Sequence, residues 1–117
     1  MMKSIVEQLI LEINDMQQTY EHVKTNQCDH DFYQIVQPYA SKIDRLLNQF
    51  QTYKLQIIRM PYMNDKKFDL LMKHIEELSV ECHFQRTSRK LFMEKIKSVH
   101  YDLQTIEDEL SNKETLS

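Results

Sequence analysis

Apolar residues recur at helical spacing along most of the chain, and most regularly between residues 91 and 110. In that stretch they are separated by four, three, four, three and four positions: Phe92, Ile96, Val99, Leu103, Ile106 and Leu110. Such a stripe covers one face of an α-helix, and the helix is stable only when other elements bury that face. We therefore expect a helix over about 88–110, packed against helices formed by the preceding chain.

Three further segments carry the same periodicity. The segment of about 3–25 has one apolar face and acidic residues predicted to face elsewhere, among them Glu7, Glu12, Asp15 and Glu21. The segment of about 31–60 holds one helical phase through Phe32, Ile35, Val36, Tyr39, Ile43, Leu46, Leu47, Phe50 and Ile57. The segment of about 66–84 points Phe68, Leu71, Ile75, Leu78 and Cys82 inward. The periodicity predicts four amphipathic helices.

The breaks between these helices are marked by their local sequences. Pro38 interrupts the second helix without shifting its phase, so we expect a kink or a break there. Pro61 ends the same helix near residue 60. Asp29 or Asp31 can cap the second helix, and Thr87 or Ser88 the fourth, because short oxygen-bearing side chains accept the free amides of a first turn. The polar tail 111–117 is expected to fray.

Four helices with short connections favour antiparallel neighbours. We predict an all-α fold, a single domain over 1–117 forming an up-down-up-down antiparallel four-helix bundle. In that topology the first and third connections lie at the same end of the bundle. The residues expected to gather there are Cys28, Asp29, His30, Asp31, Cys82, His83, Arg86 and Arg89.

Composition excludes several classes of function. The 117 residues include no glycine and two prolines. Glycine-rich phosphate loops, dinucleotide fingerprints and glycine-flanked nucleophiles are therefore absent. Turns that need a positive φ must use other residues, and we expect Asn or Asp.

Charge and hydropathy indicate where the protein acts. The net charge of −3 argues against binding nucleic acid, because general nucleic-acid binders are basic. The apolar N-terminal stretch is interrupted by Glu7, Gln8 and Glu12, so it matches neither a secretory signal nor a membrane span. We expect a cytoplasmic protein that does not bind membranes, with Cys28 and Cys82 as reduced thiols.

Several short motifs, in order along the chain, resemble those of one protein family. They are Tyr20-Glu21-His22-Val23-Lys24, Asp31-Phe32-Tyr33, Pro38-Tyr39, Arg59-Met60-Pro61, Glu77-Leu78-Ser79-Val80 with Thr87, and Lys97-Ser98-Val99-His100-Tyr101. On these the chain resembles the YppE-like family, small proteins of low-GC Gram-positive bacteria classed as a domain of unknown function. The resemblance implies a four-helix bundle. It implies no activity and carries over no catalytic or binding residue.

Metal and cofactor sites find little support in the sequence. A di-iron site in a helical bundle needs Glu and His three residues apart, and no Glu-x-x-His or Asp-x-x-His occurs. Cys28 and His30, with Cys82 and His83, would supply four zinc-type ligands at one end of the bundle. Neither pair has a common zinc spacing, and Cys82 falls on the core face of its helix. We favour a buried Cys82 that acts as a small apolar residue, and we predict no metal and no cofactor.

The fourth predicted helix has its charges reversed relative to the helix dipole. Its start is basic and its end, with Asp102, Glu107, Asp108 and Glu109, is acidic. The start is a candidate anion site, formed by Arg86, Thr87, Ser88, Arg89 and Lys90. The alternative, which we favour, is internal pairing of these cations with Asp29, Asp31 and Glu81.

A second apolar stripe appears late in the segment 31–60. It comprises Leu55, Ile58, Met60, Tyr62 and Met63. We favour its burial as additional core, since helices of a bundle often bury a wide face. The functional alternative is an exposed patch for a protein partner or a homodimer, made adaptable by methionine.

No set of residues in the sequence indicates catalysis. Cys82 and His83 are adjacent, so they point to different faces of a helix, and no third group accompanies them. The leading hypothesis is a non-enzymatic protein that acts through protein–protein contact, as an adaptor or a regulator. The alternative is a protein that binds a small ligand, an anion or a metal at the end of the bundle holding Cys28, His30, Cys82, Arg86 and Arg89.

Overall fold

The computed structural model describes residues 1–116, and the side chains of 1–113; Ser117, the last residue of the predicted frayed tail, lies outside it. The described chain is helical with short connections, which confirms the all-α prediction. Its elements are α1 (Met2–Asn26), the π-helical turn η1 (Phe32–Val36), α2 (Gln37–Gln51), α3 (Lys54–Ile57), α4 (Asp65–Glu81) and α5 (Arg89–Leu116).

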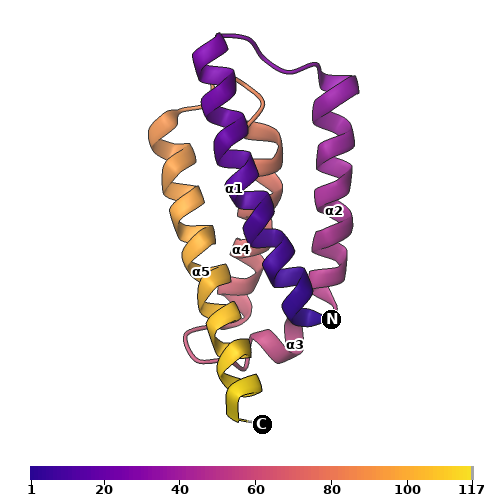
Figure 1. Ribbon diagram of the computed structural model, residues 1–117, viewed down its shortest axis with the longest axis vertical. Coiled ribbons are helices and arrows are strands. Elements are labelled where there is room, and N and C mark those ends of the chain that lie inside the picture. The colour runs from indigo at the N-terminus through magenta and orange to yellow at the C-terminus, as the bar shows by residue number, and fades with distance from the viewer. Residues whose placement is uncertain (117) are drawn as a thin grey trace.

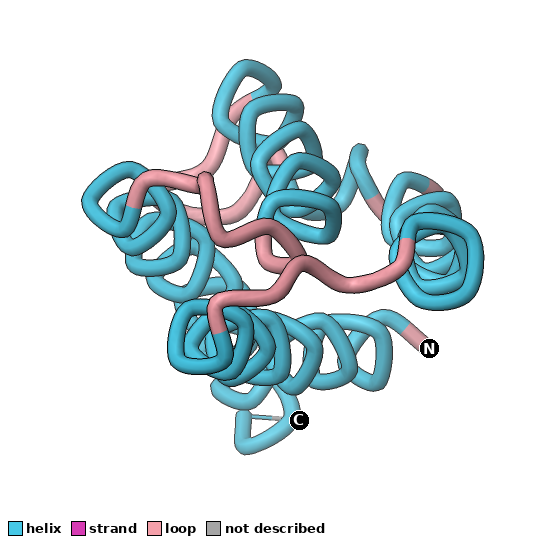
Figure 2. The backbone as a smooth tube through the Cα atoms, turned by 90° about the horizontal axis from the view of Figure 1, so that it is seen from above, coloured by secondary structure: helices cyan, strands magenta, loops and turns pink. Residues whose placement is uncertain are grey.

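The four long helices run side by side in alternating directions (Figure 1). α1 packs against α5 and α2, and α4 packs against the same two helices. The molecule is elongated, with extents of 49 × 25 × 25 Å. The connections 27–31 and 82–88 lie close together at one end (Figure 2), whereas both termini lie toward the other end. No helix of the described chain is long and apolar enough to cross a bilayer.

The apolar stripe on α5 is buried along most of its length, as its spacing predicted. Phe92, Ile96, Val99, Leu103 and Ile106 are all buried. The Phe92 ring stacks on the Tyr20 ring of α1, with centroids 4.2 Å apart. Burying a side chain of this size contributes about 1.5–3 kcal/mol, so this stripe is a main source of stability.

The predicted helix over 31–60 is divided into three pieces. In η1 the amide of Val36 donates to the Asp31 carbonyl five residues back, and Pro38 then falls in the first turn of α2. A proline is tolerated there because first-turn amides have no partner within the helix. The expected break near Pro38 is thus present. The predicted burial of Phe32 and Ile35 in η1 is wrong: they are 50% and 42% exposed, whereas Val36 is buried.

The helix ends confirm two of the predicted caps and differ from prediction elsewhere. Asp31 caps η1 by accepting from the Gln34 amide at 2.7 Å, and Ser88 caps α5 by accepting from the Leu91 amide at 3.3 Å. Thr87 does not cap α5, because its hydroxyl donates to the Glu81 carbonyl. α5 continues to Leu116, beyond the predicted end at residue 110 and through most of the tail expected to fray.

Among the described residues, two take a positive φ, and neither is the expected Asn or Asp. Gln27 (φ 52°) ends α1, and Tyr62 (φ 67°) follows Pro61 in a turn. That turn is closed by the Met63 amide, which donates to the Met60 carbonyl at 3.2 Å. Proline followed by a residue of positive φ is the pattern of a type II turn, in which glycine is preferred at the position of Tyr62.

Candidate functional site

The two connections at one end of the molecule are joined by direct hydrogen bonds. The His30 amide donates to the His83 carbonyl at 3.1 Å, and the Gln85 amide donates to Asp29 Oδ1 at 2.8 Å. Lys24 of α1 adds a hydrogen bond from its ammonium to the Gln85 carbonyl. The predicted meeting of these two connections is confirmed, and it brings two histidines into contact.

The imidazoles of His30 and His83 meet with their Nδ1 atoms 2.9 Å apart. His83 is only 3% exposed, and its Nε2 has no hydrogen-bond partner. Burial, and to a lesser extent the neighbouring His30, lower the pKa of His83 to about 4, although the Ser79 backbone acts in the opposite direction. At neutral pH His83 is therefore uncharged, and one of the two Nδ1 atoms donates to the other.

The two cysteines at this end have different environments. Cys82 is fully buried, and burial raises the pKa of its thiol to about 12, so it stays protonated. Cys28 is exposed, with its Sγ 3.6 Å from the Asp29 carbonyl oxygen. Within the described residues, no three His, Cys, Asp or Glu side chains gather in a way that could hold a metal ion. Of the four candidate zinc ligands, His30 and His83 are the two whose side chains are in direct contact.

A buried carboxylate lies between α1 and α2, and sequence reasoning missed it. Glu12, predicted to face away, is 2% exposed. It accepts hydrogen bonds from Tyr39 at 2.9 Å and Gln8 at 2.8 Å, and forms an ion pair with Lys42 at 2.7 Å. Its position could have been found, because it lies three residues after Leu9 and therefore on the apolar face of α1.

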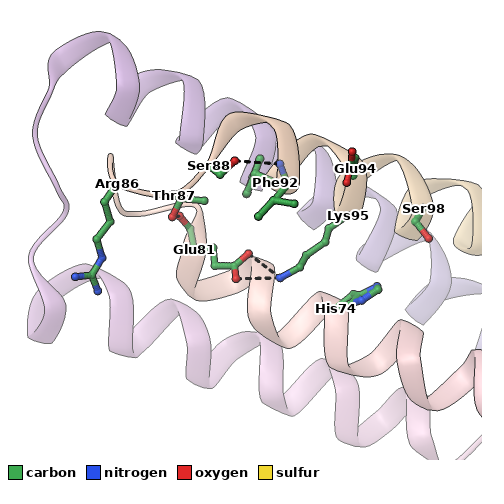
Figure 3. A pocket seen from close by; sticks show the side chains of 10 residues that line it. His74, Glu81, Arg86, Thr87, Ser88, Phe92, Glu94, Lys95 and Ser98 are labelled. Carbon is green, nitrogen blue, oxygen red and sulfur yellow. Dashed lines mark hydrogen bonds and ion pairs between the residues drawn. The ribbon is translucent and has the colours of Figure 1, made fainter.

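Two cations at the start of α5, Lys95 and Arg89, are paired internally with acidic residues; Figure 3 shows the pair of Lys95 with Glu81. Lys95 lies between Glu81, at 3.0 Å, and Glu77, at 3.2 Å, and Arg89 pairs with Glu21 of α1. Of the three carboxylates predicted to compensate this charge, Glu81 does so. Asp29 and Asp31 bind backbone amides instead.

The five candidate anion-binding residues are only partly brought together. Arg86, Thr87 and Ser88 line a cleft between α4 and α5, along with Lys95; Arg89 and Lys90 do not line it. The Arg86 guanidinium lies 5.4 Å from the centre of the Phe84 ring and points away from Lys95 (Figure 3). The cleft therefore mixes charges of both signs, which gives an anion little net attraction.

The predicted apolar patch of 55–63 is divided between core and surface. Met60 and Met63 are buried and Ile58 is partly buried, whereas Leu55 and Tyr62 are exposed. A denser exposed apolar cluster occurs on η1, where Phe32, Tyr33 and Ile35 are 50%, 77% and 42% exposed. We call these three residues the η1 surface.

Comparison with known proteins identifies the family. The model of a bacterial domain of unknown function, DUF1798, matches residues 6–110. The chain belongs to the DUF1798 family. No significant match was found among curated proteins.

Solved structures of DUF1798 proteins and of similar chains share the fold. A crystal structure of a DUF1798 protein from Staphylococcus aureus subsp. aureus is 60% identical, with a TM-score of 0.91, covering 92% of this chain and 93% of that one. A Listeria innocua protein of unknown function is 21% identical, with a TM-score of 0.91, covering 97% and 94%. The crystal structure of Bacillus subtilis yppE is 20% identical, with a TM-score of 0.88, covering 97% and 95%. The predicted resemblance to the YppE-like family is confirmed.

Proposed function

We propose that this DUF1798 protein is a non-enzymatic, cytoplasmic interaction module: an antiparallel four-helix bundle that binds another protein through the η1 surface. The observation that carries the proposal is the exposure of Phe32, Tyr33 and Ile35 within four consecutive residues. Exposed apolar clusters commonly mark interaction sites, and aromatic residues are enriched there.

The η1 surface is supported by local contacts, which favours binding. Asp31 caps the turn, Val36 is buried against the bundle, and Pro38 fixes the start of α2 directly behind it. The rings of Phe32 and Tyr33 also pack edge to face, with centroids 5.2 Å apart. A surface already ordered loses less entropy on binding, and π-helical turns often occur at functional positions.

The polar groups best suited to catalysis support a non-enzymatic role, because they are occupied by structural contacts. Glu12 is bound by Tyr39, Gln8 and Lys42. Cys82 is a buried thiol of raised pKa, which makes it a poor nucleophile.

The test is affinity purification from the native cell with a variant that removes only the η1 surface. We expect Phe32→Ser/Tyr33→Ser/Ile35→Ser to fold as the unaltered protein does, since all three side chains are exposed, and to lose the specific partner. Leu55→Ser/Tyr62→Ser is the matched control, because it removes two exposed apolar side chains elsewhere and should retain the partner.

Two results would contradict this proposal. One is partner recovery that is equal for the η1 variant and the unaltered protein. The other is a protein that is recovered alone and is monomeric by sedimentation. A dimer that the η1 variant dissociates would instead identify a second copy of the chain as the partner.

A further inference from the structure

We propose that His30 and His83 form a pH-sensitive clamp, which holds the connection 27–31 on the end of α4 at neutral pH and releases it on acidification. The clamp consists of two contacts between the same two residues. The His30 amide donates to the His83 carbonyl at 3.1 Å, and the two Nδ1 atoms lie 2.9 Å apart. The device is independent of whether the η1 surface binds a partner.

The two Nδ1 atoms share one hydrogen. Either His30 donates from Nδ1 and His83 accepts, or the roles are reversed, and both arrangements give one hydrogen bond between the rings. The other ring nitrogen of His83, Nε2, is buried and has no hydrogen-bond partner.

Protonation of both rings removes this bond. All four ring nitrogens then carry hydrogens, so the two Nδ1 atoms face each other at 2.9 Å with no acceptor between them, and two positive charges meet in a buried contact. That state is relieved by separation of the rings.

The groups around the pair do not offset this second charge. From α1, Glu12 is already paired with Lys42 of α2, and the His22 ring lies 6.3 Å from the His30 ring. Asp15 lines the groove that His30 and Lys42 also line.

The nearest groups of α2, α4 and the connection itself are neutral or engaged. From α2, the Tyr39 ring meets His83 edge to face at 5.5 Å, and its pKa is raised, so it stays neutral. From α4, Cys82 stays a thiol and Glu81 pairs with Lys95. Asp29 binds the Gln85 amide.

Opening is therefore linked to the uptake of one proton. In the open state His83 is hydrated and regains an ordinary pKa near 6.5, whereas in the closed state its pKa is about 4. Between these two values, the equilibrium constant for opening should rise by up to about tenfold for each unit of decreasing pH.

The test is amide hydrogen exchange of the full chain between pH 7 and pH 4, corrected for intrinsic rates. We expect the protection factor of the His30 amide to fall steeply below pH 6.5. The Lys67 amide, which donates to Asn64 Oδ1 at the opposite end, is the internal control and should keep its protection. A His30 protection factor independent of pH, or an equal loss at Lys67, would overturn the clamp.

Two variants separate the clamp from general effects of acid. His83→Phe keeps an aromatic ring against Tyr39 but cannot titrate, so the pH dependence at the His30 amide should disappear. His22→Gln removes a neighbouring histidine outside the clamp and should leave that dependence unchanged. If His83→Phe does not fold, ring titration by NMR of the unaltered protein decides the question. A His83 that titrates near pH 6.5 while the His30 amide stays protected would refute the proposal.

Discussion

The Glu12 carboxylate of α1 and the Tyr39 hydroxyl of α2 lie 2.9 Å apart in the interior and join the two helices. Burial acts to raise the pKa of Glu12, but hydrogen bonds from Lys42, Tyr39 and Gln8 outweigh it, and the net effect is a lowered pKa. Glu12 is therefore an anion at neutral pH, and its stability contribution depends on these donors.

Tyr39→Phe should destabilise the protein by about 1.5–3 kcal/mol, because it removes a hydrogen bond to a buried charge without altering the packing of the ring. The measurement is the free energy of unfolding in urea at pH 7. Tyr101→Phe, which removes a hydroxyl from an exposed ring, is the control and should change stability by less than about 0.5 kcal/mol. Equal effects of the two substitutions would show that the Tyr39–Glu12 bond contributes nothing.

Glu12 and His83 should both make the protein sensitive to acid, but in different pH ranges. A folded-state pKa below the unfolded value means that stability is present above the unfolded pKa and is lost as pH falls. For Glu12 the loss begins below the ordinary value of 4.5. For His83 it begins near 6.5 and extends to about 4.

The prediction for His83 concerns global stability between pH 6.5 and pH 5. The unfolding free energy of the unaltered protein should fall by up to about 1.4 kcal/mol per pH unit, since the unfolded chain binds a proton that the buried ring does not. His83→Phe should remove this slope. Glu12→Gln should lower the unfolding free energy across this range but leave its slope intact, and should remove the further loss that begins below pH 4.5. If the unfolding free energy of His83→Phe still falls with decreasing pH in this range, groups other than His83 are responsible for the acid sensitivity.

The sequence predicted the parts of the fold that depend on periodicity. The stripes of α1, α4 and α5 are buried as expected, because repeated burial on one face leaves a repeated pattern. It could not predict the exposure of Phe32 and Ile35, because these residues continue the apolar pattern of α2 although they belong to a π-helical turn. Periodicity places Glu12 on the apolar face of α1, but it does not register the donors Tyr39 and Lys42, 27 and 30 positions away, that make its burial possible.

The candidate site was predicted in location but not in chemistry. Antiparallel topology places the connections 27–31 and 82–88 together. Four helices joined by short connections were enough to predict this placement. The contact between His30 and His83 depends on side-chain directions within irregular backbone, which no local pattern encodes. The same limit explains why the ion pair of Arg89 was not predicted: its partner is Glu21 of α1 rather than a residue of a neighbouring connection.

Phe92→Ala should cost about 3–5 kcal/mol, because it leaves a cavity against the buried Tyr20 ring. The adjacent Leu91 is 60% exposed, so Leu91→Ala is a matched control with an expected cost below about 0.5 kcal/mol. Chemical denaturation of the two variants measures the difference. Similar losses for both would be inconsistent with the observed orientation of α5.

Tyr62→Asn should stabilise the protein. Tyr62 takes a φ of 67°, and this left-handed conformation costs a residue with a bulky side chain roughly 1–2 kcal/mol, whereas asparagine adopts it readily. The Tyr62 side chain is 83% exposed, so its removal sacrifices little packing, and the Lys67 ammonium can still donate to the backbone carbonyl of residue 62. We expect a gain of about 0.5–1 kcal/mol in the unfolding free energy. Tyr33→Asn makes the same exchange at another exposed tyrosine, in a helical turn where no positive φ is relieved, and should give no gain. A Tyr62→Asn protein no more stable than Tyr33→Asn would mean that the Pro61–Tyr62 turn carries no conformational strain.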